Sequence, residues 1–210
     1  MAGAETVASN ADVKSVAVDE QECAHGWVLP HILTLVPANV EVKATLKNRS
    51  AALATAGCIA DSGPEILLQE DVFFHCESDR LKLRIFHSSH GELIRYQRED
   101  RAGARRSNYL IAQTSDPYVM REILAKTLGV VGTVNKTRTL FLAGQTRIHI
   151  DQVDGLGDFL ELEVVLRPGQ PEEDGERIAK ALLNEFKVDP EDQIAVAYVD
   201  LLASKSAKAS

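Results

Sequence analysis

Charged side chains recur at every second position along several segments of this chain, with apolar side chains between them. In the clearest case, Glu161 and Glu163 alternate with Leu160, Leu162 and Val164. Successive side chains of an extended strand point to opposite faces. The segment is therefore predicted to be a strand with two glutamates on one face and three aliphatic side chains on the other.

The same spacing occurs in other segments, where it mixes acidic and basic side chains. It joins Glu41 with Lys43, Lys82 with Arg84, Lys136 with Arg138, and Arg147 with His149 and Asp151. The pattern predicts a sheet that buries its apolar face and carries both signs of charge on the other face. Such a charged face is expected to line a solvent-filled site enclosed by the sheet. Basic groups there would hold an anion of high charge, and carboxylates would hold a divalent metal. The pattern favours a polyphosphate site.

The arrangement of predicted strands favours a closed sheet. The strands are expected at 40–46, 66–75, 81–86, 92–98, 109–114, 133–142, 146–153 and 158–166. Antiparallel strands linked by hairpins, with few helices between them, do not fit an open parallel sheet. We expect an α+β fold that is mainly antiparallel β, a closed barrel with helices outside. Closure also removes the edge strands and encloses the charged face.

Four helices are predicted between and after these strands. They span 50–59, 117–128, 176–186 and about 189–202, the first capped by Ser50 and the second preceded by Asp116 and ended by Gly129. Residues 100–107 are expected to form a polar loop. Gly155 and Gly157 lack the Lys-Ser/Thr of a phosphate-binding loop, so they predict a tight turn.

Composition and length limit the class of protein. The 210 residues are 45% hydrophobic and 26% charged with a net charge of −8, which fits a globular protein and disfavours a nucleic-acid partner. The three cysteines form no CxxC pair, which is typical of reduced thiols in an intracellular protein. Without a long apolar run or a secretory signal, we expect no membrane partner and a cytoplasmic location.

The chain is expected to divide into three parts. Residues 1–38 lack periodicity and predict a flexible N-terminal extension. Residues 39–203 contain the patterned segments and predict the folded domain, and residues 204–210 predict a disordered tail.

Several short motifs carry a family resemblance. The segment from Asn39 to Lys43, NVEVK, matches most of an ExExK signature. It is followed in order by 69–74, 80–84, 96–98, 136–138, 146–151 and 155–163. This series resembles the class IV adenylyl cyclase-like branch of the CYTH, or triphosphate tunnel metalloenzyme, superfamily, and the resemblance covers residues 39–203.

The resemblance implies an eight-stranded antiparallel barrel whose tunnel binds a triphosphate with Mg²⁺ or Mn²⁺, and a homodimer is compatible with this branch. The implied substrate-binding residues are Lys43, Lys82, Arg84, Arg98, Lys136, Arg138 and Arg147. The implied metal ligands are Glu41, Glu161 and Glu163. Asp151 is either a further ligand or a residue that orients Arg147 or a water molecule. The catalytic set is Glu41, Lys43, Glu161 and Glu163.

Other side chains carry smaller expectations. Asp71 is a candidate partner for a tunnel cation, and Arg95 is expected to face outward. For His149 two roles are predicted equally: a side chain within the charged site, or one that only forms a local hydrogen bond. Tyr109 is a candidate for the tunnel mouth, although packing is the favoured role. Cys58 and Cys76 are expected in the core.

Three functions remain open. The first is a metal-dependent phosphohydrolase acting on an inorganic or organic triphosphate. The second is an adenylyl cyclase that converts ATP to cyclic AMP and pyrophosphate. The third is a triphosphate-binding protein of low turnover, favoured by Asn39, which stands where the signature has its first Glu and so removes one negative charge.

Overall fold

A computed structural model describes residues 38–86, 90–98 and 102–209. The expected N-terminal extension, except for its last residue, lies outside the described residues. The strands are β1 (Ala38–Thr45), β2 (Ser62–Phe74), β3 (Arg80–Phe86), β4 (Gly91–Arg98), β5 (Arg105–Thr114), β6 (Val130–Ala143), β7 (Thr146–Val153) and β8 (Gly157–Val165). The helices are α1 (Arg49–Ile59), α2 (Pro117–Leu128), α3 (Glu172–Glu185) and α4 (Tyr198–Ala209), with a short 3₁₀ helix, η1, at Pro190–Asp192.

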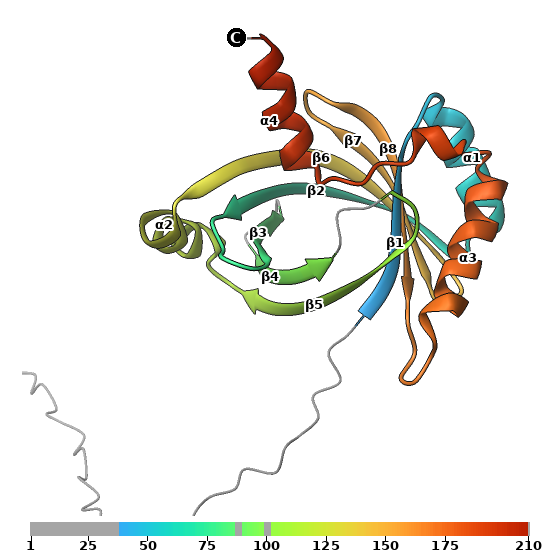
Figure 1. Cartoon of the computed structure of the whole chain (residues 1–210), viewed down its shortest axis with the longest axis horizontal. Coiled ribbons are helices and arrows are strands. Elements are labelled where there is room, and N and C mark those ends of the chain that lie inside the picture. The colour runs from blue at the N-terminus through green and yellow to red at the C-terminus, as the bar shows by residue number, and fades with distance from the viewer. Residues whose placement is uncertain (1–37, 87–89, 99–101, 210) are drawn as a thin grey trace, which may run out of the picture. The chain divides into compact units, whose positions relative to one another are not determined.

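The strands form the predicted closed antiparallel barrel, in the order β1-β5-β4-β3-β2-β6-β7-β8. Figure 1 shows the ring of strands with α1 and α3 beside β1, β7 and β8, and with α2 next to β2 and β3. This confirms the expected barrel with helices outside. Among the described residues, no helix is long and apolar enough to cross a lipid bilayer.

The main hydrophobic core lies between the barrel and the helices α1 and α3. The outward-facing Leu160, Leu162 and Val164 are at most 1% exposed and pack with Ala56 of α1 and Ala179 of α3. The aliphatic face of β8 is therefore buried as predicted, which directs its two glutamates into the barrel.

Two smaller apolar clusters complete the packing. Val72 and Leu83 pack under α2 with Met120. At one end of the barrel, Phe73 and Phe159 pack with residues that include Tyr198. The chain before α4 reaches this end because the Ile194 amide donates a hydrogen bond of 2.8 Å to the Lys43 carbonyl.

The structure corrects several local predictions. The cap of α1 is Asn48 instead of Ser50, because the Asn48 side chain accepts a hydrogen bond from the Ala51 amide. The polar loop ends earlier than expected, since β5 begins at Arg105. The single last helix is instead η1, an extended segment and α4, which continues to Ala209 through the expected tail. Cys58 and Cys76 are exposed, so the prediction that they lie in the core was wrong.

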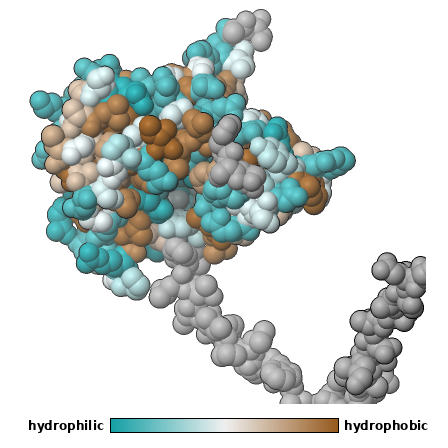
Figure 2. Space-filling model, turned by 180° about the vertical axis from the view of Figure 1, so that it is seen from behind, coloured by the Kyte–Doolittle hydropathy of each residue, from teal (hydrophilic) through white to brown (hydrophobic). Residues whose placement is uncertain are grey.

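The outer surface mixes polar and apolar side chains. The view from behind in Figure 2 shows hydrophobic atoms among hydrophilic ones on the same face. The exposed apolar side chains include Ile66, Leu110, Ile111, Tyr118 and Ile123, each at least 44% exposed.

Candidate functional site

The barrel encloses a cavity of about 170 Å³ that is lined mainly by charged side chains. The cationic ones are Lys43, Lys82, Arg84, Arg98, Lys136, Arg138 and Arg147, and the anionic ones are Glu41, Asp71, Glu92, Glu161 and Glu163. All the residues implied as substrate-binding or catalytic therefore line one cavity. Of the implied metal ligands, Asp151 alone does not line it.

Inward-facing side chains form two rows of directly paired residues across β1, β8 and β7. Glu163 lies opposite Glu41 on β1 and opposite Arg147 on β7. Glu161, two residues earlier, lies opposite Lys43 and His149. Because directly paired residues of antiparallel strands point to the same face, each carboxylate of β8 has two inward-facing neighbours.

The two glutamates of β8 sit in different electrostatic surroundings. Burial opposes ionisation of Glu161, but the Lys43 ammonium at 3.9 Å and the Arg138 guanidinium at 3.0 Å hold its pKa well below the ordinary value. Burial raises the pKa of Glu163, which the nearby Arg147 opposes and the charge of Glu161 reinforces. Glu161 is therefore the more firmly ionised of the pair.

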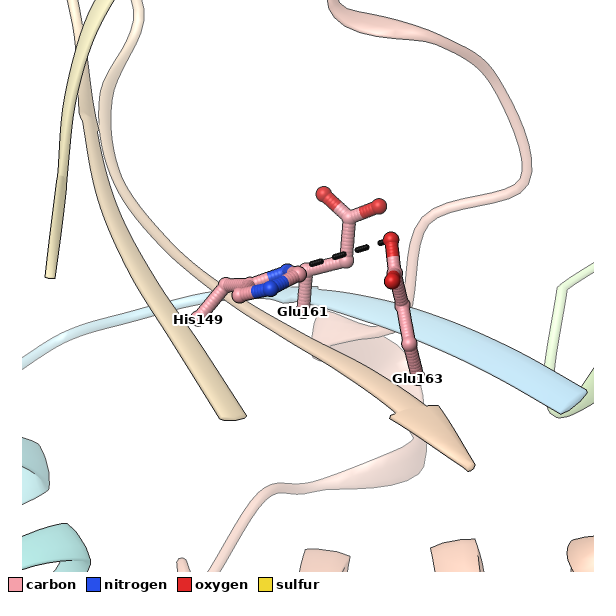
Figure 3. Close-up of side chains that lie close together, drawn as sticks. All are labelled: His149, Glu161 and Glu163. Atoms are coloured by element: carbon pink, nitrogen blue, oxygen red, sulfur yellow. Dashed lines mark ion pairs between the residues drawn. The ribbon is translucent and has the colours of Figure 1, made fainter. Parts of the chain in front are cut away.

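His149 completes a group of three potential metal ligands with these glutamates. Ligand atoms of His149, Glu161 and Glu163 lie within 4.8 Å of one another, and Figure 3 shows the imidazole beside both carboxylates. Burial and then the Arg138 charge lower the pKa of His149 well below its ordinary value, so the ring is neutral. Its Nδ1 is buried without a hydrogen-bond partner and lies 3.9 Å from Glu163 Oε1. The local hydrogen bond considered from the sequence is not formed at this atom.

The carboxylate of Asp71 on β2 forms ion pairs with three cations of β3 and β6. Asp71 lies 3.2 Å from Lys82 Nζ, 2.8 Å from Arg84 Nε and 2.6 Å from Lys136 Nζ. This confirms Asp71 as a partner of tunnel cations. Burial opposes its ionisation, yet Arg84 and Lys136 keep the pKa of Asp71 well below its ordinary value. The group carries more positive than negative charge and so favours a further anion.

Asp151 faces into the barrel from β7, directly opposite Arg138, and is fully buried without lining the cavity. Its two oxygens each accept a hydrogen bond of 2.7 Å from Arg138, and Oδ2 accepts a further bond of 3.1 Å from the Tyr198 hydroxyl. The residue that it orients is thus Arg138 and not Arg147. The Tyr198 ring also lies under Lys43, whose Nζ is 3.9 Å from the ring centroid.

Glu41 faces two guanidinium groups. Arg98 forms a close ion pair with Glu41, and Arg105 Nη2 lies 3.4 Å from the same Oε1. Asn39 lines the cavity next to Glu41 on β1, and its buried Oδ1 has no hydrogen-bond partner. Arg95, on the opposite face of β4, is exposed as expected, and it forms an ion pair with Asp79.

Sequence reasoning missed two residues of this network. Arg105 is predicted to lie in a loop, but it is separated by two residues from Ser107 and by four from Tyr109. In an extended strand this spacing puts all three side chains on the same, inward face. Tyr198 gave no such signal, because its contact with Asp151 depends on how the last segment packs against the barrel end. Tyr109, for which packing was the favoured role, instead lines the cavity, and its hydroxyl oxygen accepts a hydrogen bond of 3.3 Å from Arg147.

The chain matches the CYTH domain over residues 38–198, and it belongs to that family. A comparison with curated protein sequences gives no match.

Solved structures share the fold at low sequence identity. The PH1012 protein of Pyrococcus horikoshii has a TM-score of 0.69 at 22% identity, over 78% of this chain and 98% of that one. A candidate adenylate cyclase of Vibrio parahaemolyticus has a TM-score of 0.64 at 19% identity, over 79% and 97%. The Hippeastrum protein HpAC1, described as a candidate adenylyl cyclase with a dominant triphosphatase activity, has a TM-score of 0.58 at 14% identity, over 80% and 96%. These likenesses show the barrel fold.

Proposed function

We propose that this protein is a metal-dependent phosphohydrolase that acts on a triphosphate, either inorganic or carried by an organic group. One observation carries the proposal: seven cationic side chains from five strands line the same cavity as Glu161 and Glu163, whose carboxylates form a group of potential metal ligands with the adjacent His149. A triphosphate is a polyanion that such a cavity would bind through charge-assisted hydrogen bonds. The description of the Hippeastrum protein as a triphosphatase supports the same chemistry.

The two glutamates of the cavity and the adjacent His149 form a donor set that fits a divalent cation. Glu161 is ionised, and the neutral His149 offers an Nδ1 that has no other partner. Carboxylates suit Mg²⁺ and Mn²⁺, and Mn²⁺ also accepts an imidazole nitrogen. We propose Glu161 and Glu163 as ligands, with Glu41 and His149 beside them. Asp151, which already binds Arg138 and Tyr198, is proposed as a positioning residue.

The remaining roles follow from the charges of the chain. When bound, a divalent cation supplies a Lewis acid that polarises a phosphoryl group. Lys82, Arg84 and Lys136 would hold phosphate oxygens on the Asp71 side of the cavity. Lys43 and Arg138, beside Glu161, would offset the charge that develops on the leaving group during attack by water.

An adenylyl cyclase is the second candidate. The Vibrio and Hippeastrum proteins are described as candidate cyclases, and the same cavity could hold the three phosphates of ATP. In that reaction the ribose 3′-hydroxyl attacks the α-phosphorus and pyrophosphate leaves. The third candidate, a binding protein of low turnover, is favoured by Asn39, which contributes no charge where the signature has Glu.

Product analysis separates these candidates. Purified protein is incubated with ATP or inorganic tripolyphosphate and with Mg²⁺ or Mn²⁺, and the products are separated by chromatography. We expect orthophosphate, with turnover reduced on the order of 100-fold in Glu161→Gln. The matched control is Glu65→Gln, an exposed site on β2, which should retain wild-type turnover.

Other outcomes would overturn the proposal in distinct ways. Cyclic AMP with an equal amount of pyrophosphate would make the protein a cyclase. Tight binding with little product, and turnover that rises in Asn39→Glu, would favour the binding protein. Wild-type turnover in Glu161→Gln would place the metal site elsewhere.

A further inference from the structure

One wall of the cavity differs in chemistry from the rest. Strands β4 and β5 contribute Ile94, Tyr96, Tyr109 and Ile111 to the lining. Six of the seven lining cations lie on other strands. The exception, Arg98 on β4, is already paired with Glu41.

These four side chains form a continuous surface. In the β4–β5 register, Ile94 lies opposite Ile111 and Tyr96 lies opposite Tyr109. Directly opposed residues of antiparallel strands point to the same face with their Cβ atoms about 4.5–5.5 Å apart. The pairs are two residues apart along each strand, so they stack into one apolar and aromatic patch. We call this patch the β4–β5 wall.

The β4–β5 wall reaches the open side of the cavity. Ile94 is 6% exposed, whereas Ile111 is 44% exposed. In the described part of the chain, β1 begins opposite Asn108, so Tyr109 to Thr114 pair with β4 alone. A group lying on the wall would therefore extend from the buried interior towards solvent.

Cations border the wall where it meets the charged part of the cavity. Lys82 Nζ lies 5.6 Å from the centroid of the Tyr96 ring, and the Arg98 guanidinium lies 5.7 Å from it. Arg147 of β7 donates a hydrogen bond to the hydroxyl of Tyr109 on β5. Phosphates held by these cations would leave an attached organic group next to the two tyrosine rings.

Inorganic tripolyphosphate would make no use of this wall. Phosphate oxygens gain nothing from aliphatic and ring carbons, and Glu92, which also lines the cavity from β4, would repel them. A planar heterocycle gains both by burying its faces against apolar surface and by stacking on aromatic side chains. Organic ligand sites commonly combine such an apolar wall with a few polar groups.

We infer that the β4–β5 wall binds the planar organic group of an organic triphosphate, such as a nucleobase or another heterocycle, while the cations on the other strands bind its phosphates. This inference deepens the proposed function and rests on it. The preferred substrates would be organic triphosphates, with inorganic tripolyphosphate used less efficiently.

The test compares substrates in matched variants. Initial rates and KM are measured for ATP, UTP and inorganic tripolyphosphate with Mg²⁺ or Mn²⁺, and binding of a non-hydrolysable ATP analogue is measured by calorimetry. Tyr109→Ala and Ile111→Ala remove parts of the wall. Tyr109→Phe keeps the ring and removes only the hydroxyl that contacts Arg147. Leu110→Ala is the control, because Leu110 is as exposed as Ile111 but points to the outer face of the same strand.

We expect the KM for ATP and UTP, and the Kd of the analogue, to rise about tenfold in Tyr109→Ala and to rise in Ile111→Ala. Tripolyphosphate kinetics should stay within about twofold, because tripolyphosphate has no base to lose the aromatic contact, and Tyr109→Phe measures the separate effect of losing the hydrogen bond from Arg147. Tyr109→Phe should retain the preference for the organic substrates, and Leu110→Ala should match the wild type.

Three results would overturn the inference alone: hydrolysis of tripolyphosphate without binding of ATP or UTP, equal losses for all three substrates in Tyr109→Ala, or no loss for any. A protein that neither binds nor hydrolyses any of the three would overturn the proposed function itself, and the inference with it.

Discussion

Lys136 is a cavity cation whose charge changes with pH near neutrality. Burial, partly offset by Asp71 and reinforced by Arg84, lowers the pKa of Lys136 to about 7. A bound polyanion would raise that pKa, because it stabilises the protonated ammonium. Binding would therefore take up a proton, and affinity should be highest below the free-state pKa and fall as the pH rises through about 7.

The prediction is checked by calorimetric titration of inorganic tripolyphosphate at about pH 6 and about pH 8, on either side of the Lys136 pKa. Lys136→Met should bind more weakly and lose most of the pH dependence. The variant also shows how much of the pH dependence arises from titration of the ligand itself. An identical pH dependence in wild type and Lys136→Met would contradict the assignment.

Tyr198 is predicted to position Arg138 through Asp151. Tyr198→Phe removes one hydrogen bond to Asp151 and leaves the ring under Lys43, so we expect kcat to fall about 3- to 10-fold. Tyr198→Leu should lower it further, because Lys43 also loses its aromatic contact. Steady-state kinetics and a thermal melt check this, with the exposed Tyr118→Phe as control. Loss of thermal stability without a change in kcat would assign Tyr198 a purely structural role.

The sequence predicts which of these side chains face inward but not how they pair. Inward direction depends on the two-residue period of a strand, which is local, so Lys43, Lys136 and Glu161 could be identified. The three partners of Asp71 come from two neighbouring strands, and their distances depend on strand register. That information exists only once the barrel has closed.

Helix α3 packs unusually closely on β1 at Gly175. A Cβ added there would lie 2.6 Å from Val40 Cγ2 and 2.9 Å from Leu166 Cδ2. Gly175→Ala should therefore lower the free energy of unfolding by about 1–3 kcal/mol, because the packed core must shift to accept the methyl group.

Gly57 of α1 is the matched control, since a Cβ added there meets no atom within 4 Å. Gly57→Ala should raise the free energy of unfolding by about 0.5–1 kcal/mol through helix propensity alone. Urea denaturation of the two variants provides the comparison. A stabilised Gly175→Ala would mean that α3 does not sit against Val40 as described.

Elements with strong local signals were predicted well, and those set by tertiary contacts were not. Helix α2 is capped by Asp116, whose side chain accepts a hydrogen bond from the Val119 amide, and is ended by Gly129 as its C-cap, as the sequence predicts. The last segment reads as one helix by its apolar content. Its extended part instead bonds to β1 through the Lys43 carbonyl, a contact that no local pattern indicates.

Closure of the barrel brings twelve charged side chains from distant parts of the sequence to one cavity. Burying charges costs free energy unless they are paired, and here the cations outnumber the anions among the lining residues. A polyanion bound together with a divalent cation would neutralise the excess positive charge of the lining residues. We therefore expect the barrel to favour a polyanionic substrate that carries a bound divalent cation.

The most direct measurement is a crystal structure with inorganic tripolyphosphate and Mn²⁺, using the anomalous signal of manganese. We predict Mn²⁺ bound to Glu161 and Glu163, with phosphate oxygens in contact with Lys82, Arg84 and Lys136. Mn²⁺ outside the barrel, or a polyphosphate bound to the outer surface while the ion pairs of Asp71 stay closed to it, would contradict the account.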